Sequence, residues 1–421
     1  MERNEILADL EWRGAVNQVT DLDGLQKLTE EKAVSLYCGA DPTGDSLHIG
    51  HLIPFMILKR FQMAGHHPII VIGGGTGSIG DPSGRKSERQ LQTMDQVQHN
   101  KEALTKQMTR LFGTENFDIV DNYDWLSKIS LLDFLRIYGK EFPINVMLNK
   151  EVVASRLSAG ISFTEFTYQI LQSIDFLTLY REHDVQLQIG GADQWGNITA
   201  GTDLIHKLEG SEARVYGLTI PLMLKADGTK FGKTAGGAVW LDAEKTTPYE
   251  FYQFWLNQDD RDVVKYLKYF TFLSHDEIEA LAKKVATEPE KREAQRTLAR
   301  EVTNFVHGQK AVEEAEHISA ALFTGDLTDL SAEEIEQGFK GMPSATIAPT
   351  KINLVEFLVD LTKIEPSRRQ AREDIQNGAI YVNGQRQNET DFEVDTNAAF
   401  DGKFVIIRKG KKKYTLVRIA D

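Results

Sequence analysis

The chain has 421 residues, 41% hydrophobic and 26% charged, which is ordinary for a globular protein and enough for two to four domains. Its formal net charge of −14 argues against nucleic-acid binding over the whole surface. Apolar runs such as 68–72 are too short to cross a bilayer, and a single cysteine, Cys38, excludes a disulfide framework. We therefore expect a cytoplasmic protein that does not bind a membrane.

The first recognisable elements are a strand, a turn and a helix that together can bind an anion. Residues 33–38 are apolar and β-like, 39–46 form a turn with Gly and Pro, and 47–60 have helical apolar spacing. This order directs backbone N–H groups and a positive helix end at an anion. His48 and His51 lie on one face at the start of the helix and can contact phosphate oxygens or a ribose. A zinc site is disfavoured because no cysteine or acidic cluster completes a ligand set. Two ordinary surface histidines are the other alternative.

Four further strand candidates complete a Rossmann-like α/β region. They are residues 68–73, 117–120, 185–189 and 215–220. A glycine-rich run, 73–84, follows the first of them, and such loops line the ligand crevice of parallel sheets. Arg85, Lys86 and Arg89 come directly after this run and provide cations for a phosphate. We predict that residues 1–222 form a Rossmann-like parallel-sheet catalytic domain.

A polar stripe lies on a predicted helix over residues 164–176. Tyr168, Gln172 and Asp175 occupy positions i, i+4 and i+7, which places them on one helical face. The pattern itself fits an exposed face and a pocket wall equally well.

The rest of the chain divides into a lysine-bearing segment, a helical domain and a linker. Residues 223–245 contain Lys230-Phe231-Gly232-Lys233-Thr234. Residues 246–325 have a helix start at Thr247-Pro248 and long helical stretches, so we predict an α-helical domain. Residues 326–350 are acidic, contain Gly and Pro and have no strong periodicity, which indicates a linker.

The C-terminal region, 351–421, is predicted to be a small α+β domain that binds RNA. It carries 13 Lys+Arg and 11 Asp+Glu, a net charge of +2, so the preceding 350 residues have −16. A positive patch on an acidic protein is typical of a selective RNA binder, although a solvated basic tail is the alternative. Interleaved apolar residues in 403–418 predict a hairpin rather than a tail. The candidate RNA-binding residues are Arg368, Arg369, Arg372, Lys409, Lys411, Lys412 and Lys413.

These motifs resemble those of a known enzyme family. The segment 37–51, which contains His48-Ile49-Gly50-His51, and the segment 230–234 are similar to the HIGH and KMSKS motifs of the class I aminoacyl-tRNA synthetases. The amino-acid sequence of 37–43 resembles that of the bacterial tyrosyl-tRNA synthetases, and the predicted helix 368–376 resembles that of an S4 RNA-binding domain. The resemblance covers nearly the whole chain. It implies that tyrosine is activated with ATP and then transferred to a tRNA specific for tyrosine.

The resemblance also implies roles for single residues. For tyrosine, it implies hydrogen bonds to the phenolic hydroxyl from Tyr37 and Asp175, ammonium binding by Asp81, Tyr168 and Gln172, and a contact from Gln194. For ATP, it implies contacts from Cys38, Gly39, Asp41, Gly50, Gly191, Asp193, Lys233 and Thr234. For stabilising the departing pyrophosphate, it implies Thr43, His48, His51, Arg85, Arg89, Lys230 and Lys233. A buried carboxylate left unpaired by phenylalanine would explain selection of tyrosine.

The resemblance further implies ATP as a substrate accompanied by Mg²⁺, no prosthetic group, no metal held by the protein itself, and a homodimer formed by residues 120–180. The lysine loop departs from the family in reading Lys-Phe-Gly-Lys-Thr, and Arg85 stands where many relatives carry lysine. A tryptophanyl-tRNA synthetase is the nearest alternative. A small-molecule nucleotidyltransferase would leave the helical and C-terminal domains unexplained, and a non-catalytic RNA-binding paralogue would be expected to lack the lysines or histidines.

Overall fold

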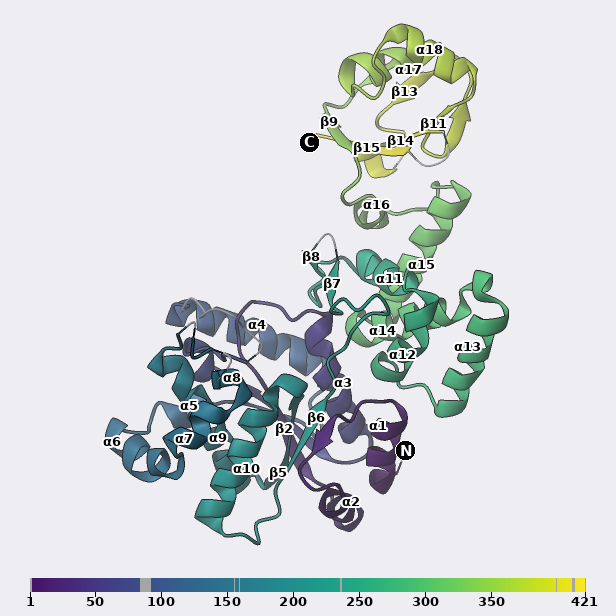
Figure 1. Ribbon diagram of the computed structural model, residues 1–421. Coiled ribbons are helices and arrows are strands. Elements are labelled where there is room, and N and C mark those ends of the chain that lie inside the picture. Colours follow the sequence, from purple (N-terminus) through teal and green to yellow (C-terminus); the bar gives the residue numbers. More distant parts are fainter. Residues whose placement is uncertain are drawn as a thin grey trace. The chain divides into compact units, whose positions relative to one another are not determined.

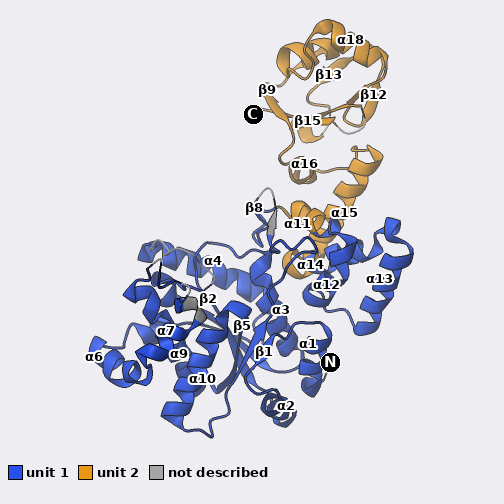
Figure 2. Ribbon diagram, in the orientation of Figure 1, with its two compact units in different colours: residues 1–246, 255–302 blue, residues 247–254, 303–421 orange. Residues whose placement is uncertain are grey.

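The computed structural model describes residues 2–83, 92–154, 156–158, 160–234, 237–398, 400–410 and 413–420 (Figure 1). The chain divides into two compact units. Unit 1 comprises residues 1–246 and 255–302, and unit 2 comprises residues 247–254 and 303–421 (Figure 2). No helix within these described residues is long and apolar enough to cross a membrane.

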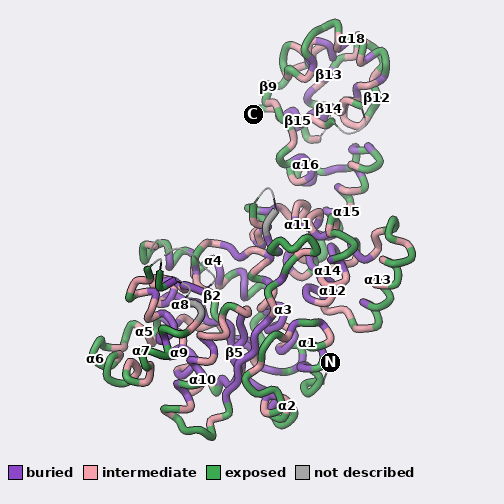
Figure 3. The backbone as a smooth tube through the Cα atoms, in the orientation of Figure 1, coloured by how far each residue is buried: buried purple, intermediate pink, exposed green. Residues whose placement is uncertain are grey.

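Unit 1 is built on a twisted, mostly parallel sheet with the strand order β1-β6-β5-β2-β3-β4. The strands are β1 (Gln18–Val19), β2 (Ser35–Ala40), β3 (His67–Ile72), β4 (Asp118–Asp121), β5 (Val185–Gly191) and β6 (Tyr216–Ile220). Only β1, at one edge, is antiparallel to its neighbour among these strands. Figure 3 shows buried positions concentrated on β5. The predicted Rossmann-like α/β fold is confirmed, because continuous apolar strands pair in parallel when both sheet faces are covered.

Helices surround this sheet, and α3, α4, α9 and α10 contact its strands directly. The helices of unit 1 are α1 (Ile6–Trp12), α2 (Leu22–Glu31), α3 (Ile49–Met63), α4 (Met94–Phe112), α5 (Tyr123–Leu126), α6 (Leu131–Asp133), α7 (Ile144–Asn149), α8 (Glu151–Ala154), α9 (Phe163–His183), α10 (Trp195–Glu209), α12 (Asp260–Phe270) and α13 (His275–Thr287). Helix α9 begins where the Ser162 side chain accepts a hydrogen bond from the Glu165 backbone N–H. The short edge strand β1 and helices α1 and α2 were not predicted.

Unit 2 contains a helical part and a small mixed domain. Its helices are α15 (Gln309–Thr324), α16 (Ala332–Gly338), α17 (Leu354–Glu356) and α18 (Arg368–Gln376), together with parts of α11 (Pro248–Leu256) and α14 (Glu293–His307). One sheet has the order β12-β11-β14-β15-β9, made of β12 (Gln385–Gln387), β11 (Ile380–Val382), β14 (Phe404–Lys409), β15 (Lys413–Ile419) and β9 (Ser344–Ile347). Strand β10 (Lys351–Asn353) pairs separately with β13 (Glu393–Asp395). The predicted basic hairpin over 403–418 is the pair β14 and β15.

The segment 326–350, expected to be a linker, is instead part of the folded core of unit 2. It contains α16, and it contains β9, which pairs in parallel with β15. Leu327 and Leu330 are buried in one cluster with Ile406 and Leu416. No periodic signal was visible in this segment because its elements are only four to seven residues long, too short to repeat an apolar pattern.

The connections of unit 1 create a crevice at the middle of its sheet. From β2 the chain proceeds outward through β3 to β4, and then it returns through α9 to β5 on the other side of β2. The strand order therefore reverses between β2 and β5. Ligands of open α/β sheets bind at the carboxyl ends of strands at such a reversal.

Candidate functional site

A pocket of about 290 Å³ opens at the carboxyl ends of β2, β3 and β5, where the strand order reverses. Its lining contains every residue predicted for the tyrosine substrate: Tyr37, Asp81, Tyr168, Gln172, Asp175 and Gln194. It also contains half of those predicted for ATP and pyrophosphate: Cys38, Gly39, Asp41, Thr43, His51, Gly191 and Asp193. The ambiguous stripe on α9 is therefore a pocket wall.

Tyr37 and Asp175 form the deep end of this pocket. The Tyr37 side chain is 1% exposed, and its hydroxyl has no hydrogen-bond partner among the described residues. Its ring packs edge-on against Phe176, with ring centroids 5.3 Å apart. Burial, and then the negative charge of Asp175, raise the pKa of Tyr37 well above its usual value. A buried hydroxyl without a partner is costly, so this arrangement suits a ligand that brings a polar group.

The carboxylate of Asp175 is held by two donors that sequence reasoning missed. Asn122 Nδ2 donates to Oδ2 at 2.9 Å, and Trp125 Nε1 donates to Oδ1 at 2.8 Å. Burial raises the pKa of Asp175 to about 7, even though these two hydrogen bonds lower it. Asn122 directly follows β4, and a polar residue at a strand end is a usable signal. Trp125 gave no signal.

A second carboxylate, Asp41, sits at the end of β2 and is bound from two sides. Tyr168 donates its hydroxyl hydrogen to Oδ2 at 2.9 Å, and Thr76 Oγ1 donates to Oδ1 at 2.8 Å. The carboxylate also passes so close to Gly73 that any Cβ there would collide with it. Tyr168, expected to bind the substrate ammonium together with Asp81, thus has Asp41 as its own hydroxyl partner.

Asp81 belongs to a chain of amide hydrogen bonds along the opposite wall. Gln194 Nε2 donates to Asp81 Oδ2 at 2.9 Å. Asn197 Nδ2 in turn donates to Gln194 Oε1 and to Gln172 Oε1, both at 3.2 Å. These contacts fix the orientation of two side-chain amides and a carboxylate that line the pocket.

The two histidines sit at the start of α3, which begins at Ile49 rather than at Leu47. His48 is the N-cap, and its Nδ1 accepts a hydrogen bond from the Gly50 backbone N–H at 3.0 Å. His51 Nδ1 accepts from the His48 backbone N–H at 3.3 Å, and the two rings stack with centroids 3.9 Å apart. Because both Nδ1 atoms accept, the neutral rings carry their proton on Nε2, which is a donor suited to phosphate oxygens.

Gly50 lies where the histidine turn meets the lysine loop. A Cβ on Gly50 would approach His48 Cε1 to 2.8 Å, and a Cβ on Gly232 would stand 3.5 Å from Gly50 Cα. Gly232 also has a φ of +100°, a conformation that favours glycine. The two motifs, about 180 residues apart in the chain, therefore meet.

Backbone pairing just beyond the lysine loop holds it beside α3. The Leu241 N–H donates to the Leu47 carbonyl at 2.8 Å, and the Ile49 N–H donates to the Val239 carbonyl at 3.0 Å. Lys230 is exposed. Lys233 and Thr234 form strand β7 (Lys233–Thr234), which pairs with β8 (Gly237–Ala238). Predicted Arg85, Lys86 and Arg89 lie outside the described residues.

Six of the seven candidate RNA-binding residues of unit 2 fall into three groups. Arg369 and Arg372, on α18, and Lys413 are exposed and make no ion pair with a described residue. Arg368 is exposed but donates to Asp360 at 2.6 Å. Lys411 and Lys412 lie outside the described residues.

Lys409 has a different environment from the one predicted. Its Nζ lies 2.7 Å from Glu365 Oε1 and 2.8 Å from Asp374 Oδ2. The Glu365 side chain has no exposed surface. Burial raises the pKa of Glu365, and Lys409 opposes that shift. Lys409 therefore compensates a buried carboxylate, which is a structural role, and its assignment to RNA stays a prediction.

Comparison with known proteins gives concordant matches over both units. A family profile described as tRNA synthetases class I (W and Y) matches residues 29–324, and one described as the tyrosine–tRNA ligase SYY-like C-terminal domain matches residues 334–417. The chain is similar to a tyrosine–tRNA ligase of Limosilactobacillus reuteri, with 75% identity over 99% of this chain and 100% of that protein. A second ligase of that name, from Lactiplantibacillus plantarum, is 73% identical over 98% of this chain and 99% of that protein.

Solved structures agree with this similarity. A C-terminally truncated mitochondrial tyrosyl-tRNA synthetase of Coccidioides posadasii superposes with a TM-score of 0.65 at 36% identity, covering 74% of this chain and 91% of that one. A tryptophanyl-tRNA synthetase of Encephalitozoon cuniculi has a TM-score of 0.55 at 18% identity, covering 75% of this chain and 90% of that one, which is a likeness of fold alone.

Proposed function

The chain belongs to the class I tyrosine–tRNA ligases, and we propose that it binds tyrosine and ATP side by side in the pocket at the carboxyl ends of β2 and β5. As a member of this family it is an ATP-dependent aminoacyl-tRNA synthetase whose partners are tyrosine, ATP and tRNA. The tryptophan alternative is set aside, because the full-length relatives are tyrosine–tRNA ligases. The residue roles that follow are our proposal.

Tyr37 and Asp175 recognise the phenolic hydroxyl of the substrate. The observation that carries this assignment is the buried Tyr37 hydroxyl without a partner, on the same pocket wall as a carboxylate that accepts from Asn122 and Trp125. The substrate hydroxyl can donate to Asp175 and accept from Tyr37, which satisfies both groups. Phenylalanine would desolvate them without replacing a hydrogen bond.

The substrate ammonium is bound nearer the pocket mouth by the polar wall of Asp81, Tyr168, Gln172 and Gln194. Two features support this assignment. Asp81 and Asp41 supply negative charge, and the amide chain through Asn197 fixes the acceptors in advance. Preorganised acceptors lower the cost of binding a cation.

In the first reaction step a carboxylate oxygen of tyrosine attacks the α-phosphorus of ATP. The new oxygen–phosphorus bond forms as the bond to the bridging oxygen breaks, and the electron pair leaves with pyrophosphate. The carboxylate is already a nucleophile, so no general base is needed. The charge on pyrophosphate is stabilised by Thr43, His48, His51, Lys230, Lys233, Arg85 and Arg89. The remainder of ATP is bound by Cys38, Gly39, Asp41, Gly50, Gly191, Asp193 and Thr234.

Gly39 illustrates why the nucleotide fits there. A Cβ built on it meets no atom within 4 Å, so this backbone leaves open space at the pocket wall. Magnesium enters with ATP as part of the substrate and is held mainly by phosphate oxygens, which are the ligands that this hard cation prefers.

Two copies of the chain form a homodimer through the segment 131–163. Several of its large apolar side chains are unusually exposed: Leu131 is 72% exposed, Leu132 76% and Phe163 72%, and Leu135, Ile144 and Val146 are at least half exposed. Such a patch marks an interface, and a second copy of the same chain is the simplest partner.

The tRNA is bound by α18 and the basic hairpin of unit 2. The unpaired Cys38 suits a reducing cytoplasm.

A crystal structure with a non-hydrolysable tyrosyl-adenylate analogue tests these roles. We expect its phenolic oxygen within hydrogen-bonding distance of both Tyr37 Oη and an Asp175 carboxylate oxygen, with its ribose beside Asp193. A phenol that lies at the pocket mouth, with the adenosine at Asp175, would contradict the assignment.

A further inference from the structure

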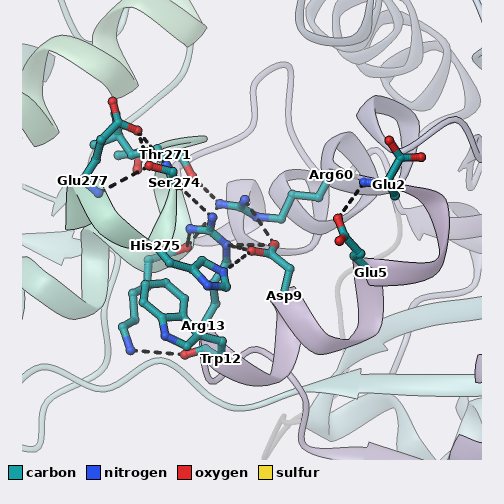
Figure 4. A network of polar contacts seen from close by, with 12 residues as sticks. Glu2, Glu5, Asp9, Trp12, Arg13, Arg60, Thr271, Ser274, His275 and Glu277 are labelled. Carbon is teal, nitrogen blue, oxygen red and sulfur yellow. Dashed lines mark hydrogen bonds and ion pairs between the residues drawn. The ribbon is translucent and has the colours of Figure 1, made fainter. Parts of the chain in front are cut away.

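Far from the pocket, unit 1 contains a buried cluster in which two arginines share one carboxylate (Figure 4). Asp9 lies on α1, Arg13 caps the C-terminal end of α1, and Arg60 lies in the last turn of α3. Arg13 Nε is 2.9 Å from both Asp9 oxygens, and Arg60 Nη1 is 3.7 Å from Asp9 Oδ2. Burial of a second guanidinium is unfavourable, and the pKa of Arg60 falls to about 9 because of burial and the charge of Arg13.

Carbonyl groups at the end of α12 compensate this surplus positive charge. Arg13 donates to the carbonyls of Lys268 at 3.0 Å and of Leu273 at 2.8 Å. Arg60 Nη2 donates to the carbonyl of Lys268 at 3.2 Å and to that of Thr271. A helix C-terminal end attracts cations, so the two arginines clamp the end of α12 to α1 and α3.

The other face of α12 carries the lysine loop. The Phe231 side chain is buried against Tyr266 and Phe270, with ring centroids 4.9 and 5.2 Å apart. The carboxylate of Asp262 accepts from the Ala226 backbone N–H at 3.0 Å, and Lys265 donates to the Leu224 carbonyl. The hairpin that presents Lys230 and Lys233 is thus fixed on α12 rather than on the sheet.

Helix α3 connects the same cluster to the histidines. Arg60 is twelve residues after His48, a distance of about 18 Å along an α-helix. The His48–His51 turn and the lysine loop are therefore carried by two helices, α3 and α12, that Arg60 joins at one end. The alternative is that the cluster stabilises unit 1 in general, but two guanidiniums around one carboxylate are a poor choice for stability alone.

We propose that Arg60, together with Arg13 and organised by Asp9, is a positioning residue for catalysis, which sets α12 and its lysine loop against the histidine turn of α3. The inference rests on the proposed function of the lysines and histidines. It adds a contact between α3 and α12, made by Arg60, in which none of those residues takes part. Arg60 touches neither substrate, so it acts only through α12 and α3.

A double-mutant cycle tests the proposal in the full-length protein. The rate of tyrosyl-adenylate formation is measured in single turnovers, and the dissociation constant of tyrosine by equilibrium dialysis, for Arg60→Met, Lys230→Ala and the double variant. We expect Arg60→Met to slow adenylate formation at least tenfold and to change tyrosine affinity less than twofold. In the Lys230→Ala background we expect Arg60→Met to slow it less than threefold further, because the lysine is no longer there to be positioned. A general loss of stability would give the same fold-loss in both backgrounds.

Arg292→Met is the matched control, because Arg292 also donates to two backbone carbonyls, of Leu256 at 2.8 Å and Gln258 at 3.1 Å, without contacting α3. Its rate should stay within twofold of the parent. Equal losses in both backgrounds, or an equal loss in Arg292→Met, would overturn the proposal. Should Arg60→Met lose its cooperative melting transition, Arg60→Lys tests the proposal by the same cycle, since lysine keeps the positive charge but lacks the branched guanidinium. A parental rate for Lys230→Ala would overturn the lysine role itself, and the inference with it, whereas a slow Lys230→Ala with additive Arg60 effects overturns the inference alone.

Discussion

At the scale of single residues, the proposed specificity for tyrosine depends on one carboxylate in a buried pocket. Asp175 is 4% exposed, and its two oxygens already accept from Asn122 and Trp125. Both donors favour the ionised form, and both hold the carboxylate in one orientation. A ligand hydroxyl that reaches Asp175 therefore finds a preorganised acceptor, and a ligand without a hydroxyl leaves it desolvated.

Replacing Asp175 by Asn should damage the selection of tyrosine without unfolding the protein. Loss of a hydrogen bond to a charged group costs about 1.5–3 kcal/mol, so we expect tyrosine affinity to fall roughly 10- to 100-fold. Affinity for phenylalanine should change much less. Equilibrium dialysis with both amino acids measures this, and circular dichroism checks the fold. Normal tyrosine binding with intact rejection of phenylalanine would show that the pocket is misassigned.

The same residue predicts a pH dependence of tyrosine binding. Burial raises the pKa of Asp175 to about 7, with Asp41 and Asp121 adding to the shift. Below that pH the free protein holds a proton on Asp175, which must be lost before the carboxylate can accept from the phenol. Tyrosine affinity should thus be highest above pH 7 and weaken by up to about tenfold per pH unit below it. Asp175→Asn should show no such slope between pH 5 and 8, and a slope that persists in this variant would assign it to another group.

At the scale of elements, the lysine loop depends on α12 beneath it and α3 beside it. The loop meets the histidine turn through backbone contacts at Gly232 and Gly50. Lys230 and Lys233 should act late, when charge develops on pyrophosphate. Each Lys→Ala change should slow adenylate formation by about 2–4 kcal/mol of transition-state stabilisation. Stopped-flow single turnovers measure this, with tyrosine affinity as the internal control. Parental rates in both variants would exclude the assigned role.

Phe231 provides a separate test at the same scale. Its ring is the loop's anchor in the cluster with Tyr266, Phe270 and Trp255. Phe231→Leu keeps an apolar side chain but fills less of that cluster, so adenylate formation should slow while both lysines remain. We expect a smaller loss than for either lysine variant. A larger loss than for Lys230→Ala would mean that the cluster supports more of unit 1 than the loop.

Elements with strong local patterns could be predicted from the sequence, and elements defined by distant partners could not. The strands at 35–40, 67–72 and 185–191 and the motif around His48 were predicted because apolar runs and glycine-rich turns are local signals. Trp125 was missed because it acts only through Asp175. The ion pair of Lys409 was missed because a sequence shows charges but not the buried Glu365 that pairs with one of them.

At the scale of the whole molecule, we expect the two units to divide the reaction. The pocket lies wholly in unit 1, and the exposed arginines of α18 lie in unit 2. Arg369→Glu combined with Arg372→Glu should abolish transfer of tyrosine to tRNA and leave adenylate formation intact. Lys27→Glu combined with Lys283→Glu, an equal charge change at exposed sites of unit 1, is the control and should leave tRNA charging nearly unchanged. Equal loss of both activities in the arginine variant would point to a structural role for α18.

Salt and truncation extend this prediction. The affinity of the full-length protein for tRNA should fall as salt rises, with a slope proportional to the number of phosphate contacts, while tyrosine affinity stays constant. A truncation after Pro349 would leave β9 without its partner β15, so a chain ending at Thr324 is the better test. That chain should form adenylate but not charge tRNA. If it loses adenylate formation in proportion to charging, the C-terminal domain supports catalysis itself.

The measurement that tests the central claim most directly is exchange of labelled pyrophosphate into ATP, with each amino acid supplied alone to the purified full-length protein. A pocket ending at Tyr37 and Asp175 predicts exchange with tyrosine and none above background with phenylalanine or tryptophan. Exchange with tryptophan at a comparable rate, or exchange without any amino acid, would contradict the account.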